Sequence, residues 1–299
     1  MPPIKNVALL GADGQLGSAI LHALLSANYT VTVLKRHSSK SPDSYPAPVT
    51  VNRFPDDLEP HALASALQGQ HALIASIKGS QTAIQQRLAE ACLISNVQRF
   101  IPADFGSCDS STALTQELVP LYKRKAELRA YLQDLASRHP DFSWTSLVCG
   151  HFFDWSLEFV HLWPAEHRAD ILDDGETRFS MSTLSRVAEA TVRVLERPAE
   201  TRNRMLYVQS FCVTQREIIA AYEAVMGREW EVVAFESGKF RDEQKAKAEA
   251  GDAGANEELV WYLGTVDADW RSREDFAMKL LGLEDEGLKE AVQKVVSGL

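Results

Sequence analysis

The 299-residue sequence has only four cysteines, and they are scattered along the chain. Cys92, Cys108, Cys149 and Cys212 include no Cys-x-x-Cys pair, and no histidine lies near them at metal-ligand spacing. Disulfide-stabilised domains are shorter and much richer in cysteine. The four residues are therefore expected to be reduced thiols in a reducing compartment, and no metal site is predicted.

Long hydrophobic runs and excess positive charge are also absent. No stretch approaches the ~18 apolar residues of a membrane-spanning helix, and the first apolar run is too short for a signal peptide. Lys and Arg number 31 against 41 Asp and Glu, a formal net charge of −10. Because phosphate groups repel such a surface, we expect neither nucleic acid nor a membrane as partner. The sequence thus predicts a cytoplasmic globular protein and leaves its oligomeric state open.

What the sequence does contain, in its first half, is a regular alternation of short apolar runs and segments of helical periodicity. Strands are expected at residues 6–10, 30–34, 49–53, 71–77, 99–102 and 142–148. Helices are expected at residues 16–27, 61–67, 83–92 and 122–137. We interpret this half as strictly alternating strands and helices, which predicts the α/β class and a doubly wound parallel sheet of the Rossmann type.

After residue 150 the alternation becomes irregular, and we expect the chain to divide there. Residues 1–150 are predicted to form a dinucleotide-binding Rossmann domain whose sheet is completed by residues 183–210. Residues 151–182 and 211–299 are predicted to form a smaller C-terminal α/β region that binds the substrate. The charged segment 239–256 has two interpretations, a solvated helix and loop or a lid over a substrate cleft.

Three glycines follow the first predicted strand at the spacing of a dinucleotide-binding loop. Gly11 permits a sharp turn, Gly14 lets the backbone approach a pyrophosphate, and Gly17 lets the next helix pack on the sheet. The N-terminus of that helix adds N–H donors and a partial positive charge. The predicted cofactor contacts in this loop are Gly11, Asp13, Gly14, Gln15, Leu16 and Gly17.

The second strand ends in basic residues. Folds that prefer NAD usually place an acidic residue here, on the ribose 2′-hydroxyl. A guanidinium can instead bind the 2′-phosphate of NADP with two hydrogen bonds. We therefore assign Arg36 to the 2′-phosphate and Lys40 as a second contact, which predicts NADP(H) as the cofactor.

Several motifs together resemble a known family. They are the glycine loop, Arg-Phe-Ile-Pro-Ala-Asp-Phe-Gly at 99–106, Leu-Tyr-Lys-Arg-Lys-Ala-Glu-Leu at 121–128, and segments 174–181, 201–210 and 270–276. Over nearly its whole length the chain resembles the NmrA-like and isoflavone-reductase-like atypical short-chain dehydrogenases, in particular their fungal branch. The resemblance implies an NADPH-dependent reductase fold with a small C-terminal substrate domain.

Two departures from the resembled family fall in the predicted site. Asp13 stands where family loops usually carry Thr or Ser, which brings a carboxylate close to the phosphates. Ala103 and Asp104 replace the Ser-Glu of the plant branch. Asp104 is either a second ionisable group of the site or a cap of the loop at the strand end.

The Tyr-x-x-x-Lys pair of ordinary short-chain dehydrogenases is missing, because Ala126 follows Tyr122 by four residues. Reductases of the resembled group use a lysine at the start of this helix, and Lys123 and Lys125 are the two candidates. Their positions differ by about 200° around the helix. Lys125 shares a face with an apolar stripe formed by Leu128, Leu132 and Leu135.

We therefore predict Lys125 as the catalytic residue. We expect it to bind the nicotinamide ribose as well, beside cofactor contacts from Pro102 and Ala103 at the end of strand 99–102. The alternative is a lysine whose stem covers the edge of the apolar stripe while its ammonium reaches water.

Aromatic residues follow the last core strand, at the edge of the sheet where ligands of such folds bind. We predict that they line a pocket for a small hydrophobic substrate, although core packing would explain them equally well. They are His151, Phe152, Phe153 and Trp155.

These features favour an NADPH-dependent oxidoreductase that reduces a small hydrophobic carbonyl compound or conjugated alkene. The resemblance adds specialised metabolism as the setting. Two alternatives remain: a non-catalytic NADP(H) sensor that binds a protein partner, and an NADP(H)-bound isomerase without net redox change.

Overall fold

The computed structural model describes residues 3–298, which form two compact units. The first unit comprises the chain up to Phe105 together with Arg124–Leu147 and Val187–Leu206. The second comprises Gly106–Lys123, Val148–Arg186 and the chain from Tyr207 onward. Each unit therefore contains segments that are distant in the sequence.

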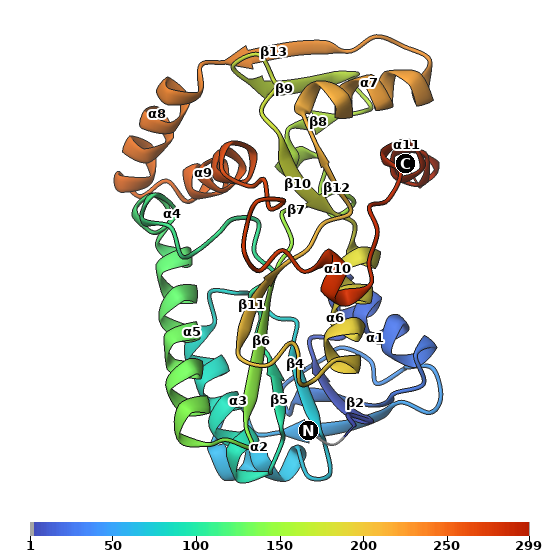
Figure 1. The fold of residues 1–299 in the computed structure, drawn as a ribbon, viewed down its shortest axis with the longest axis vertical. Helices are drawn as coiled ribbons and strands as arrows, with labels where there is room; N and C mark the ends of the chain where they lie inside the picture. The colour runs from blue at the N-terminus through green and yellow to red at the C-terminus, as the bar shows by residue number, and fades with distance from the viewer. Residues whose placement is uncertain (1–2, 299) are drawn as a thin grey trace. The chain divides into compact units, whose positions relative to one another are not determined.

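The first unit contains a seven-stranded sheet in the order β11-β6-β5-β4-β1-β2-β3 (Figure 1). The strands are β1 (Asn6–Leu10), β2 (Thr30–Arg36), β3 (Thr50–Phe54), β4 (Ala72–Ala75), β5 (Arg99–Ile101), β6 (Ser143–Val148) and β11 (Arg204–Tyr207). From β3 through β6, neighbouring strands are parallel. The carboxyl ends of β1, β4 and β5 therefore lie side by side at one edge.

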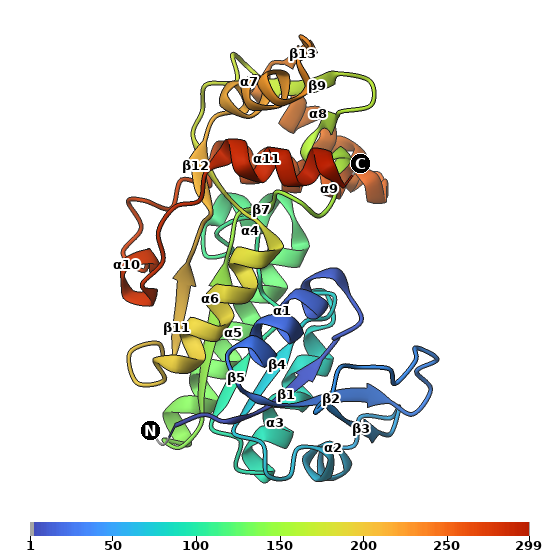
Figure 2. The same ribbon diagram turned by 90° about the vertical axis from the view of Figure 1, so that its right-hand side faces the viewer.

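Helices cover both faces of this sheet. α1 (Gln15–Ser26) and α6 (Leu184–Glu196) lie on one face, and α2 (Pro60–Ala66), α3 (Thr82–Ile94) and α5 (Pro120–Arg138) lie on the other (Figures 1 and 2). This arrangement confirms the predicted doubly wound fold. The strict alternation was wrong at one point, because β2 and β3 are joined by an irregular loop, residues 37–49, and not by a helix.

The core of the first unit forms where helical apolar stripes meet strands that are covered on both faces. Leu63 of α2, Leu88 of α3 and Leu132 of α5 are buried against the sheet in one cluster. Strands such as β4, buried at all four positions, need an apolar residue on both faces. The apolar runs of the sequence are therefore continuous and do not alternate with polar residues.

The second unit contains two three-stranded sheets, β12-β10-β7 and β13-β9-β8. Their strands are β7 (His151–Phe152), β8 (Leu162–Trp163), β9 (Arg168–Leu172), β10 (Phe179–Ser182), β12 (Phe211–Val213) and β13 (Glu231–Phe235). The helices of this unit are α4 (Ala113–Leu118), η1 (Glu158–Val160), α7 (Gln215–Met226), α8 (Ser237–Glu249), α9 (Ala253–Val266), α10 (Met278–Leu281) and α11 (Leu288–Ser297). None of the helices within residues 3–298 combines the length and apolar composition needed to span a bilayer.

The charged segment 239–256 forms most of α8 and the start of α9. Phe240 and Gln244 are buried, so α8 has one packed face and one solvated face. Phe240 belongs to a core cluster with Leu259 and Trp261 of α9. The segment is therefore helical and attached to its own unit, and its role as a lid stays a prediction.

Candidate functional site

The glycine loop joins β1 to α1, and its three glycines have different surroundings. A Cβ on Gly11, where φ is +92°, would lie 2.0 Å from the carbonyl oxygen of Ser76. A Cβ on Gly17 would lie 1.9 Å from the carbonyl oxygen of Gly11. On Gly14 the nearest atom would be 3.6 Å away, an ordinary contact. The fold itself thus requires Gly11 and Gly17, whereas Gly14 leaves space open above the loop.

The N-terminus of α1 is suited to an anion. Gly14 is the N-cap residue, no side chain caps this end, and the first turn has no acidic residue. Gly14 and Gln15 are exposed, and Leu16 is half-buried. The N–H donors and the partial positive charge of a twelve-residue helix therefore face outward at the position predicted for a diphosphate.

The loop after β2 contains both expected and unexpected residues. Arg36 and Lys40, which we assigned to a 2′-phosphate, are both exposed. Lys35, which the sequence analysis missed, is only 4% exposed, and its Nζ lies 3.3 Å from Oδ2 of Asp13. A lysine directly after the apolar residues Val33 and Leu34 was the available indication. Asp13, a residue of the glycine loop, therefore also contacts Lys35 near the end of β2.

Lys125 on α5 is buried, whereas Lys123 is exposed, which confirms the predicted helix face. Nζ of Lys125 donates to the backbone oxygen of Asp104 at 2.5 Å and lies 3.5 Å from Oδ1 of the same residue. Nη1 of Arg129 donates to Oδ2 of Asp104 at 2.8 Å. All three side chains are buried, so the carboxylate of Asp104 balances two cations.

The stem of Lys125 lies over Gly79, in the segment that follows β4. A Cβ on Gly79 would come within 2.8 Å of Cε of Lys125 and 3.2 Å of the backbone oxygen of Ala103. Pro102 and Ala103, just after β5, are also buried. Because β1, β4 and β5 are adjacent, Lys125 and the glycine loop lie at the same edge of the sheet.

Asp104→Asn is expected to lower the free energy of unfolding by about 3 kcal/mol, because it removes the buried negative charge that Lys125 and Arg129 both contact. Asp134→Asn is the matched control. Asp134 forms an exposed carboxylate–guanidinium pair with Arg138, and both residues lie on α5. Exposed pairs contribute little to stability. Urea denaturation measures both variants, and equal losses would contradict the proposed charge balance.

The four predicted substrate residues do not share one pocket. Phe153 is fully buried and packs edge-to-face on Phe211, with ring centroids 5.1 Å apart. His151 is 1% exposed, whereas Trp155 is 49% exposed and contacts the half-buried Phe152 edge-to-face at 6.5 Å. His151 and Phe153 are thus core residues, and Trp155 reaches the surface.

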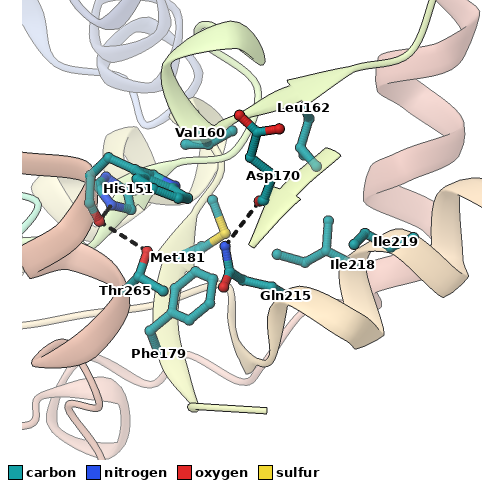
Figure 3. Close-up of a pocket in the computed structure, with 11 residues that line it drawn as sticks. His151, Val160, Leu162, Asp170, Phe179, Met181, Gln215, Ile218, Ile219 and Thr265 are labelled. Atoms are coloured by element: carbon teal, nitrogen blue, oxygen red, sulfur yellow. Dashed lines mark hydrogen bonds between the residues drawn. The ribbon is translucent and has the colours of Figure 1, made fainter. Parts of the chain in front are cut away.

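His151 lines a small internal cavity (Figure 3). The figure shows apolar side chains around it, including Phe179 and Met181. The cavity offers ≈ 10 Å³ to the centre of a water molecule, room for about one water. Burial lowers the pKa of His151 to about 4, so the ring is neutral near pH 7. A cavity of this size does not suit the predicted pocket for a small hydrophobic substrate.

A second, open cleft of ≈ 1190 Å³ lies elsewhere in the second unit. Its apolar wall includes Trp155, Leu157, Trp163, Pro164, Met226 and Val295. Its polar groups include Asp154, Thr183, Glu286 and Lys294. Of the four predicted substrate residues, only Trp155 lines it. Nothing in the sequence indicated that α11 lines this cleft, because an amphipathic helix near the end of a chain looks like any other surface helix.

The parallel sheet, the glycine loop and the uncapped helix N-terminus define a Rossmann-type nucleotide-binding fold. The family model of the NmrA-like family matches residues 3–245, and the chain belongs to that family. Oxidoreductase poxI of Penicillium oxalicum is 30% identical over 293 residues, which cover 95% of this chain and 92% of that protein.

Solved structures share the fold. A crystal structure of isoflavone reductase has a TM-score of 0.76 at 18% identity, covering 99% of this chain and 100% of that one. The binary complex of leucoanthocyanidin reductase with NADPH, from Vitis vinifera, has a TM-score of 0.78 at 16% identity and covers 98% and 99%. The predicted relationship to the NmrA-like and isoflavone-reductase-like group is therefore confirmed.

Proposed function

We propose that this protein is a cytoplasmic NADPH-dependent oxidoreductase that reduces a small hydrophobic carbonyl compound or conjugated alkene in specialised metabolism. The observation that carries the proposal is the buried ammonium of Lys125. It lies at the carboxyl edge of the same sheet as a glycine loop with open space above Gly14. Burying an ammonium is costly, and a catalytic role would explain why the chain retains one there.

The first unit supplies the groups that would hold NADPH. The open loop at Gly14 and the N-terminus of α1 suit the diphosphate, and exposed Arg36 and Lys40 suit the 2′-phosphate. Pro102 and Ala103 would contact the nicotinamide end of the cofactor. Two findings support this assignment. Leucoanthocyanidin reductase, which has the same fold, holds NADPH, and poxI is named an oxidoreductase.

Lys125 would have two tasks in the reaction. When bound, NADPH would supply a hydride to a carbon of the substrate. The Lys125 ammonium would hydrogen-bond the nicotinamide ribose and stabilise, or protonate, the substrate oxygen that gains negative charge. Asp104 would act as a positioning residue, because its backbone oxygen and carboxylate hold Nζ in place.

The second unit would bind the substrate. Its open cleft has an apolar wall with two tryptophans, Trp155 and Trp163, and a few polar groups, as small-molecule sites commonly do. The proposed division of labour thus places the cofactor on the first unit and the substrate on the second. It replaces the predicted pocket of His151, Phe152, Phe153 and Trp155 with a cleft that keeps only Trp155 of the four.

The test is incubation of the purified protein with NADPH and a broad panel of carbonyl compounds and enones. Consumption of NADPH with a product heavier by two hydrogen atoms is the expected result. Saturable NADPH binding without consumption, together with capture of a protein partner, would favour the sensor. A product of unchanged mass would favour the isomerase.

A further inference from the structure

The carboxylate of Asp13 is held by three donors, one from β2 and two from the loop 37–49 that follows it. Oγ of Ser41 and the hydroxyl of Tyr45 each donate to it at 2.6 Å. Nζ of Lys35 lies 3.3 Å from the same carboxylate and 4.9 Å from the centre of the Tyr45 ring. We call Asp13, Lys35, Ser41 and Tyr45 the Asp13 cluster. It ties the glycine loop to the loop 37–49.

Lys35 also holds the loop 37–49 in place. Its Nζ donates to the backbone oxygen of Pro42 at 2.6 Å and to Oγ of Ser41 at 3.0 Å. The same ammonium lies 3.4 Å from Asp43, whose carboxylate accepts two hydrogen bonds from Arg53. The donors around Asp13 are therefore positioned by the protein independently of any ligand.

These donors lie where a Rossmann fold recognises the substituent on the ribose 2′ position. That recognition occurs at the end of the second strand, which here ends at Arg36, next to Lys35. An ammonium and two hydroxyls are donors that suit a phosphate as well as a carboxylate. Burial alone raises the pKa of Asp13, but hydrogen bonds from Ser41, Tyr45 and Lys35 outweigh it and lower the pKa. The carboxylate is therefore charged near pH 7.

We propose that Asp13 determines cofactor selectivity, because its carboxylate occupies donors that a ribose 2′-phosphate would use and repels that phosphate. This inference rests on the proposed function, in which the loop binds NADP(H). NADPH must displace Asp13 from Lys35, Ser41 and Tyr45, or bind beside a like charge, whereas NADH meets neither cost. The chain thus favours NADPH over NADH less than its basic residues Arg36 and Lys40 alone would allow.

The experiment compares wild type with Asp13→Asn, which removes the charge at nearly constant size, and with Asp13→Ser. Calorimetry measures the dissociation constants of NADPH, NADH, 2′,5′-ADP and 5′-AMP. In both variants the affinity for NADPH and 2′,5′-ADP is expected to rise roughly tenfold or more, equivalent to about 1.4 kcal/mol. The affinity for NADH and 5′-AMP should change much less.

Asp134→Asn is the matched control. It makes the same change in net charge within the first unit, but its carboxylate is exposed and pairs with Arg138 on α5. We expect it to leave the ratio of NADPH to NADH affinity almost unchanged. If this control changes the affinity ratio as much as the Asp13 variants do, the inference is overturned, because the effect then comes from the net charge of the protein alone.

Two further outcomes separate the inference from the proposed function. If both cofactors bind and the Asp13 variants change their affinities equally, Asp13 does not determine selectivity, but the proposed function stands. If neither NADPH nor NADH binds to wild type or to any variant, the proposed function fails and the inference fails with it.

Discussion

Alanine in place of Lys125 is expected to lower turnover at least about 100-fold, the low end of a general acid's contribution, while NADPH affinity falls much less. The ammonium would act mainly when the substrate oxygen gains charge, so its loss affects the transition state more than cofactor binding. The groups proposed to bind the diphosphate and the 2′-phosphate are expected to supply most of the binding energy, and they lie elsewhere in the first unit.

Two control variants separate chemistry from packing. Lys123→Ala removes the same charge from the exposed side of α5 and should leave turnover unchanged. Lys125→Met keeps an unbranched apolar stem over Gly79 and should be as inactive as Lys125→Ala. Steady-state kinetics and NADPH titration measure all three. Turnover at the wild-type rate in Lys125→Ala would dismiss the catalytic assignment.

Alanine is expected to have different effects at two positions of the glycine loop. At Gly14 it should lower the affinity for NADPH, and at Gly17 it should lower the stability of the fold. Gly14→Ala is expected to fold normally and to lose at least roughly tenfold in NADPH affinity, because the new methyl group would occupy the space proposed for the diphosphate. The backbone of Gly14 is extended, with φ of −77°, so alanine adopts it without strain. The change of N-cap residue costs at most about 1 kcal/mol.

Gly17→Ala should instead destabilise the fold. Its methyl group would lie 1.9 Å from the carbonyl oxygen of Gly11, so α1 must move away from the loop. Overpacking of this kind costs about 3 kcal/mol or more. Thermal unfolding and NADPH titration of both variants provide the comparison. Equal losses of stability, or unchanged NADPH affinity in Gly14→Ala, would contradict the roles assigned to these glycines.

Regular elements of the first unit could be predicted because their residues follow simple periods. The continuous apolar run of β1 predicted its bounds correctly, at Asn6–Leu10. The spacing of Lys125 with Leu128, Leu132 and Leu135 predicted which lysine of α5 would be buried. Such patterns depend on neighbours within one helix or strand, which the sequence displays directly.

The second unit was predicted less completely. β7 and β8 have two residues each, too few to show an alternation. α4 has six residues, and the sequence analysis missed it. His151 and Phe153 were predicted to line a pocket, yet both are buried in the core. Aromatic residues after a strand suit a core and a pocket equally, so the sequence could not distinguish the two.

The sequence by itself determined the fold class, the glycine loop and the buried face of α5, because local spacing dictates each of them. Only the tertiary structure decided what surrounds the charged groups. Lys125 contacts Asp104 from 21 residues away, and Tyr45 contacts Asp13 from 32 residues away. No local period relates such residues, and the hydrogen bonds that hold them depend on how strands and loops meet in space.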